Sequence, residues 1–117
     1  MQGNNYWTNG GSLLIQWTSS NYSDLPSFRS ATGMEMYNGT PVGSVVDPQL
    51  TAAGTGGSIN NPDALNTLTA YTPKAGSPMI DTALTLSTMF GVNAGPTDFR
   101  GTAIYRGLAY DVGAVEY

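Results

Sequence analysis

Residues 75–117 read AGSPMIDTALTLSTMFGVNAGPTDFRGTAIYRGLAYDVGAVEY, and the predicted fold is organised around this stretch. Its pattern predicts a turn, a short helix, a Gly-rich loop and a final apolar strand. Asp81 can cap a helix over residues 82–90, and Gly91 can end it. The small pair Gly113-Ala114 lies inside the last strand and indicates a bulge or a close backbone approach there.

The N-terminal half contains one clear strand signal and one helix signal. Residues 12–17 (SLLIQW) alternate apolar and polar side chains, which is typical of a half-buried strand. Ser23 or Asp24 can then cap a helix that runs through Ser30 or Ala31 and closes at Gly33. Both elements have the short length expected of a small domain.

The middle of the chain is predicted to contain loops and one further strand. Residues 34–46 and the Gly-rich residues 51–61 are predicted to be loops, because turn residues interrupt them repeatedly. Residues 66–72 (NTLTAYT) alternate again and predict a strand.

The composition limits both size and chemistry. A chain of 117 residues has room for one domain, and its 40% hydrophobic content argues against disorder. Only 10% of residues are charged, which suits an extracellular β-rich protein. The net charge of −4 disfavours nucleic acid as a partner, and the absence of His and Cys removes disulfides, imidazole bases and most zinc sites.

The termini and hydropathy carry less information. The sequence has no run of ~18 apolar residues, so no membrane span is expected. The start, Met1-Gln2-Gly3-Asn4-Asn5, lacks the basic and apolar regions of a signal peptide.

Three signatures in the C-terminal stretch carry a family resemblance. They are Gly76-Ser77-Pro78-x-Ile80-Asp81, Thr97-Asp98-Phe99-x-Gly101 and Tyr110-Asp111-Val112-Gly113-Ala114-x-Glu116-Tyr117, supported upstream by Asn4-Asn5-Tyr6-Trp7 and Asp47-Pro48-x-Leu50. In this order they resemble the C-terminal segment of secreted bacterial right-handed parallel β-helix proteins of the pectate-lyase-like kind. The resemblance spans essentially the whole chain.

The resemblance implies a fold, a location and a mode of assembly. The implied fold is all-β, formed by the terminal coils of a right-handed parallel β-helix with two short helices, in a single domain over residues 1–117. The implied location is extracellular. Since members of the family are usually exported and the start of this chain lacks an export signal, the chain is expected to be part of a longer protein, either a precursor that has lost its front or an excised or mispredicted fragment. A β-helix end leaves strand edges and apolar side chains open, so a homo-oligomer through that end is expected. No catalytic motif of a lyase or hydrolase is carried over.

Asp98, Asp111 and Glu116 are the candidate catalytic residues, since a glycoside hydrolase needs two carboxylates. The alternative is structural. Asp98 would then bond the backbone of its own turn, and Asp111 would pair with Arg100 or Arg106.

Tyr6, Trp7 and Tyr105 are the candidate carbohydrate-binding residues, because aromatic rings offer an apolar face to a sugar. No cofactor and no metal site is predicted. Calcium is the one ion left open, through the oxygen-bearing side chains of Asp63, Asn60, Asn61 and Asn66, although these lack the dense Asp spacing of a calcium loop.

The leading prediction from the sequence is a structural C-terminal cap or assembly module of an extracellular polysaccharide-acting β-helix protein. A carbohydrate-binding module and a small carboxylate-dependent glycoside hydrolase or polysaccharide lyase remain as alternatives. Polysaccharide is the expected partner of the second and third, and whether the isolated chain catalyses any reaction stays open.

Overall fold

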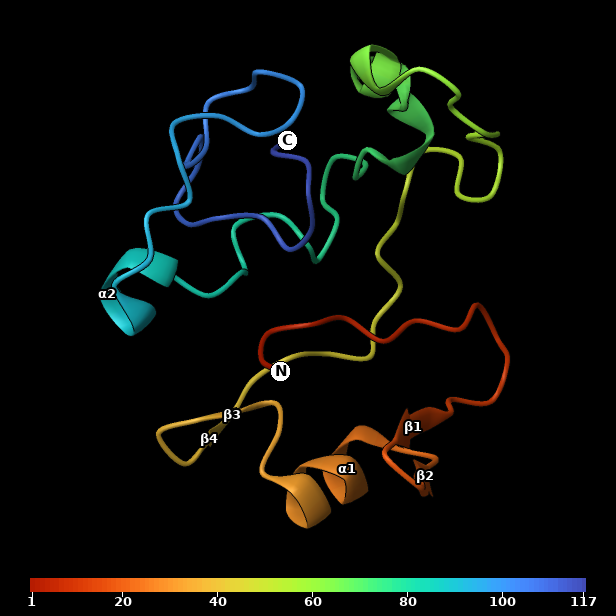
Figure 1. The fold of residues 1–117 in the computed structure, drawn as a ribbon, viewed down its shortest axis with the longest axis vertical. Coiled ribbons are helices and arrows are strands. Elements are labelled where there is room, and N and C mark those ends of the chain that lie inside the picture. The colour runs from red at the N-terminus through yellow and green to blue at the C-terminus, as the bar shows by residue number, and fades with distance from the viewer. The chain divides into compact units, whose positions relative to one another are not determined.

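The computed structural model describes residues 1–117 and divides the chain into two compact units, Met1–Asp47 and Pro48–Tyr117. Figure 1 shows short elements separated by long loops: strands and a helix in the N-terminal unit, and helical elements alone in the C-terminal unit. None of the helices reaches the length and apolarity that crossing a bilayer requires.

The N-terminal unit begins its regular structure with an antiparallel hairpin. Strand β1 (Ile15–Trp17) pairs with β2 (Ser20–Tyr22), with Ile15 opposite Tyr22 and Trp17 opposite Ser20. The strand predicted over residues 12–17 is therefore confirmed only for its second half. Ile15 is buried while Gln16 is exposed, as the alternation of the sequence requires.

Helix α1 (Leu25–Thr32) confirms the predicted helix and its caps. The Ser27 N–H donates to the Asp24 carboxylate at 2.7 Å, which satisfies one free N–H at the start of the helix. Gly33 ends the helix with φ of 69°, and its N–H donates to the Arg29 carbonyl at 2.9 Å. Glycine adopts this left-handed conformation without the steric cost of a Cβ.

A small aromatic core joins the hairpin to this helix. Phe28 is completely buried together with Ile15 and Leu25. The rings of Tyr6, Trp17 and Tyr22 meet Phe28 edge-on, at centroid separations of 6.5, 6.0 and 5.4 Å. Such pairs contribute about 0.5–1.5 kcal/mol each beyond the area that they bury, so Phe28 holds this unit together.

The second hairpin of the N-terminal unit was not expected. Strands β3 (Met36–Tyr37) and β4 (Thr40–Pro41) pair across Asn38-Gly39, both at positive φ, where a loop had been predicted. An Asn-Gly pair is the preferred two-residue hairpin turn. Beyond it, Ser44 bridges Asn5 in parallel, so the start of the chain lies along this return segment (Figure 1).

The C-terminal unit contains helical turns where a strand was predicted. Residues 66–72 fall in two 3₁₀ helices, η1 (Pro62–Thr67) and η2 (Thr69–Tyr71), so the strand prediction is wrong. Pro62 presets the first helical φ, and the Asn61 side chain accepts from the Asp63 N–H at 3.0 Å. This local start signal outweighs the alternation that follows it.

The second predicted helix is shorter than expected. Helix α2 (Leu86–Phe90) starts four residues later than predicted, and Thr85 occupies its N-cap position without a side-chain cap bond. Gly91 ends the helix as predicted, at φ of 65°. Asp81 is not a helix cap, because its carboxylate accepts elsewhere, from Leu108 and Ala109.

The final strand is also absent. Residues 110–117 form an irregular segment beside residues 79–83, joined by the Val112 N–H to the Met79 carbonyl and the Ala83 N–H to the Tyr110 carbonyl, both at 2.8 Å (Figure 1). Met79 and Val115 are buried apolar side chains of this unit.

The parallel β-helix prediction is wrong, and so is the all-β class. Most of the chain is irregular, and its regular strands form two separate two-stranded antiparallel hairpins. A β-helix needs extended segments that pair in parallel with those of the next coil. Here twelve glycines and seven other residues have positive φ, a backbone conformation that regular strands do not contain. Parallel pairing is confined to the single bridge between Asn5 and Ser44.

Candidate functional site

The carboxylate of Asp98 organises a turn of its own segment. Its Oδ1 accepts from the N–H groups of Arg100 and Thr102, both at 2.8 Å, and its Oδ2 accepts from the Glu116 N–H at 3.1 Å. The first of these bonds is the turn contact predicted for Asp98. Partial burial disfavours the charged form, but the three N–H donors outweigh it and lower the pKa of Asp98 below its ordinary value.

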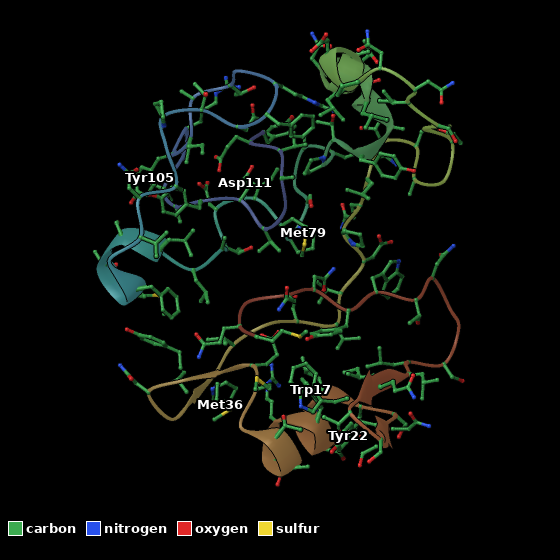
Figure 2. All side chains as sticks on the ribbon, viewed as in Figure 1. Trp17, Tyr22, Met36, Met79, Tyr105 and Asp111 are labelled. Carbon is green, nitrogen blue, oxygen red and sulfur yellow. The ribbon has the colours of Figure 1, made fainter.

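Asp111 lies in the C-terminal unit (Figure 2). It is almost fully buried, with 7% of its surface exposed. Its Oδ1 accepts from the Asp81 N–H at 2.8 Å and its Oδ2 from the Tyr117 N–H at 2.7 Å. Asp111 was predicted to pair with Arg100 or Arg106, but its oxygens accept from these main-chain N–H groups instead. The Arg100 guanidinium donates to the Thr72 hydroxyl at 2.6 Å and to the Leu68 carbonyl.

Glu116 connects the other two acids. The Asp111 N–H donates to its Oε1 at 3.3 Å, while its own N–H donates to Asp98. The structure therefore brings together all three predicted carboxylates, in what we call the acid network, defined as Asp98, Asp111 and Glu116. Each member accepts main-chain N–H groups, as carboxylates do when they hold loops in place.

Asp81 extends the acid network, and sequence reasoning assigned it a different role. It has a left-handed backbone with φ of 57°, and its Oδ1 accepts from the N–H groups of Leu108 at 2.6 Å and Ala109 at 3.0 Å. The carboxylate lies directly over Gly107, where a Cβ would collide with it. The spacing from Asp81 to Gly107 carries no local signal, so only the tertiary structure could reveal this contact.

The three candidate aromatic residues have different surroundings. Tyr6 is half-buried against Phe28, whereas Trp7 is 42% exposed in the same unit. Tyr105 is 52% exposed in the C-terminal unit, and its ring meets Tyr110 edge-on at 5.1 Å (Figure 2). Tyr6 and Trp7 thus belong to one unit and Tyr105 to the other.

Glu35 is a fully buried carboxylate that the sequence analysis missed. Its Oε2 accepts from the Gly3 N–H at 2.5 Å, and its Oε1 accepts from the Asn4 side-chain amide at 2.5 Å and the Tyr6 hydroxyl at 2.9 Å. Burial, followed by the bond to Glu35 and its negative charge, raises the pKa of Tyr6 to about 12. Glu35 therefore ties the first six residues to the body of the unit.

The sequence does contain a weak signal for this residue. Glu35 follows the helix-ending Gly33 and lies between Met34 and Met36, a single acid in an apolar context. An acid in that position needs several donors if it is buried. Arg29 completes the arrangement by donating to the main-chain carbonyls of Glu35 at 3.2 Å and Val42 at 2.5 Å.

In the group of oxygen-bearing side chains considered for calcium, one oxygen already accepts a local hydrogen bond. The Asn61 side-chain oxygen accepts from the Asp63 N–H, as described for η1. The structure contains no group of three or more His, Cys, Asp or Glu side chains placed to hold a metal ion. Within this cluster, Asn61 and Asp63 form the start of a helical turn.

Comparison of the chain with family models, with curated proteins and with solved structures finds no match. The resemblance to secreted polysaccharide-acting proteins therefore rests on the sequence signatures alone.

Proposed function

We propose that this chain is a structural module, a cap or assembly segment of an extracellular polysaccharide-acting protein. The observation that carries the proposal is the use of the acid network. Every member accepts main-chain N–H groups, and two such bonds occupy both oxygens of buried Asp111. A hydrolase needs one acid to give a proton and another to receive one beside the substrate.

The context of the module comes from the sequence. Its C-terminal signatures resemble segments of secreted polysaccharide-acting proteins, and a weakly charged surface suits an extracellular location. The fold implied by that resemblance is not retained in the proposal. What remains is a loop-rich segment whose acids hold its own backbone.

Assembly is supported by exposed apolar side chains in the C-terminal unit. Leu108 is 87% exposed, and Phe90, Val92 and Phe99 are each more than two fifths exposed. Burying such side chains against another polypeptide gains about 25 cal/mol for each Å² removed from water. We propose that this unit associates with a second copy or with further polypeptide of the same protein.

The test of the structural role compares stability with activity. Reducing-sugar release from a panel of polysaccharides and thermal unfolding are measured for the wild-type chain and for the Asp98→Asn, Asp111→Asn and Glu116→Gln variants. We expect no release from the wild type and a lower melting temperature for the variants, with Asp111→Asn the most affected. Sugar release that Asp111→Asn abolishes while its fold and melting temperature stay intact would overturn the proposal.

Self-association is tested by sedimentation velocity over a range of concentrations. Leu108→Ser should reduce the oligomer, whereas Leu14→Ser is the matched control, because Leu14 is 66% exposed but lies in the N-terminal unit. A monodisperse monomer at all concentrations would refute self-association.

A further inference from the structure

A small hollow in the C-terminal unit lies between the loop over residues 51–56 and the 3₁₀ turns over residues 67–70. Its volume is about 260 Å³. Four threonines line it, together with small apolar side chains: Thr51, Thr55, Thr67 and Thr69, with Ala52 and Ala70. None of the residues lining the hollow is charged.

The two walls of the hollow are fixed to one another by main-chain hydrogen bonds. The Ala52 N–H donates to the Ala70 carbonyl and the Thr51 N–H donates to the Thr72 carbonyl, both at 2.9 Å. The Arg100 side chain supports the second wall from outside by donating to Thr72 and to the Leu68 carbonyl. The lining is thus held in place before any ligand arrives, which lowers the entropic cost of binding.

Most hydroxyl groups of the lining already use their proton in an internal hydrogen bond. Those of Thr51, Thr55 and Thr67 donate to main-chain carbonyls, at 2.9, 2.7 and 2.7 Å. Each of these oxygens can therefore only accept from a ligand, since its one proton is used. The Thr69 hydroxyl has no such bond and can donate or accept. A ligand that fits this pattern must carry several donors.

An aromatic ring packs against one residue of the lining. Tyr71 is 40% exposed, and its ring packs directly over Gly56, where a Cβ would collide with it. Gly56 is itself part of the lining. Tyr71 is not itself part of the lining, so its ring supports the wall at Gly56, while the lining offers hydroxyl acceptors and small apolar side chains to a ligand.

We infer that this hollow is a binding site for a single neutral sugar ring. A sugar ring supplies several hydroxyl donors for the threonine oxygens and an apolar C–H face for Ala52, Leu68 and Ala70. The uncharged lining favours a neutral ring over a uronic acid or an amine. The volume of 260 Å³ lies just below the ~300–1,000 Å³ typical of sites for drug-sized ligands, so one ring is the matching size.

This site is separate from the structural role proposed above. It uses none of the residues of the acid network and none of the aromatic residues that the sequence singled out. If no sugar binds, Asp111→Asn is still expected to lower stability. If Asp111→Asn leaves stability unchanged, sugar binding in the hollow is still expected.

The test is a titration of the full chain with methyl glycosides of glucose, galactose, mannose and xylose, followed by amide chemical shifts. N-acetylglycinamide and galacturonate serve as neutral non-sugar and charged-sugar comparisons. At least one methyl glycoside should bind with millimolar affinity and shift the amides of residues 51–56 and 67–71 selectively.

Two variants and one control locate the site. Thr69→Val removes a hydroxyl that makes no internal hydrogen bond and should weaken binding by about fivefold to tenfold, the worth of one hydrogen bond. Gly56→Ala should weaken it further by displacing Tyr71. Thr88→Val in α2 changes a threonine that lies outside the hollow, and it should leave the affinity unchanged.

The results that overturn the inference are equally specific. They are the absence of selective shifts with every methyl glycoside, equal binding of N-acetylglycinamide or of galacturonate, or wild-type affinity in Thr69→Val.

Discussion

Replacement of Glu35 by Gln should destabilise the N-terminal unit strongly while changing almost nothing in shape. The buried carboxylate accepts three short hydrogen bonds, from the Gly3 N–H, the Asn4 side-chain amide and the Tyr6 hydroxyl. Glutamine keeps one oxygen, which can remain on the fixed Gly3 N–H. Its NH₂ group then faces two former donors, so the Asn4 amide must flip and the Tyr6 hydroxyl must rotate to accept.

The magnitude follows from the loss of charge. A hydrogen bond to a charged group contributes about 1.5–3 kcal/mol, against about 0.5–1.5 kcal/mol for a neutral one. Each of the three bonds at Glu35 therefore weakens by about 1 kcal/mol, and the free energy of unfolding should fall by about 3 kcal/mol. Tyr6→Phe removes a single donor and should cost about half as much, which makes it the graded comparison.

Urea unfolding followed by tryptophan fluorescence measures the effect. Both tryptophans, Trp7 and Trp17, belong to the N-terminal unit, so their emission reports on the unit that contains Glu35. Glu35→Gln should lower the urea midpoint by about 1–3 M. A change in the free energy of unfolding below about 0.5 kcal/mol, the range of an ordinary surface substitution, would refute the reasoning.

Three further predictions concern packing and pH. Gly107→Ala should destabilise the C-terminal unit by about 1–3 kcal/mol, because the new methyl group meets the Asp81 carboxylate, and thermal unfolding measures it. Because the pKa of Asp98 is lower in the folded state than the ordinary value of 3.8, its carboxylate stabilises the fold above that pH, and the contribution is lost as the pH falls below about 4. Acid unfolding should show this loss of stability, and the part that is due to Asp98 should be absent in Asp98→Asn. The raised pKa of Tyr6 has the opposite pH dependence: its contribution to stability is present below pH 10 and is lost as the pH rises towards 12. Phenolate absorbance should show one tyrosine that titrates near 12, and this titration should disappear in Tyr6→Phe. A titration curve that Tyr6→Phe leaves unchanged would contradict the contact with Glu35.

Local signals in the sequence were reliable where the interaction partners are near in the chain. Asp24 caps α1 by bonding the N–H three residues later, and Gly33 ends it. Asp98 bonds the N–H two residues later, as the turn pattern indicates. In each case the donor and the acceptor belong to one short segment, so residue types and spacing suffice to predict the contact.

The predictions that failed depend on partners far along the chain. Alternation over residues 66–72 predicted a strand, but a strand forms only when another segment supplies hydrogen bonds, and Pro62 with Asn61 starts 3₁₀ turns instead. The β-helix prediction failed for the same reason, since the chain pairs its strands only within short antiparallel hairpins. Motif resemblance carries no information about whether parallel partners exist.

The sequence by itself determined the helix α1 with its two caps, the limits on chemistry set by the lack of His and Cys, and the identity of the three acids of the acid network. Only the tertiary structure decided what those acids do. It placed main-chain N–H groups on them from segments up to about thirty residues away, as between Asp81 and Asp111. It also buried Glu35 under the first residues of the chain. The physical reason is that the role of a carboxylate depends on which donors reach it, and long-range contacts bring those donors together.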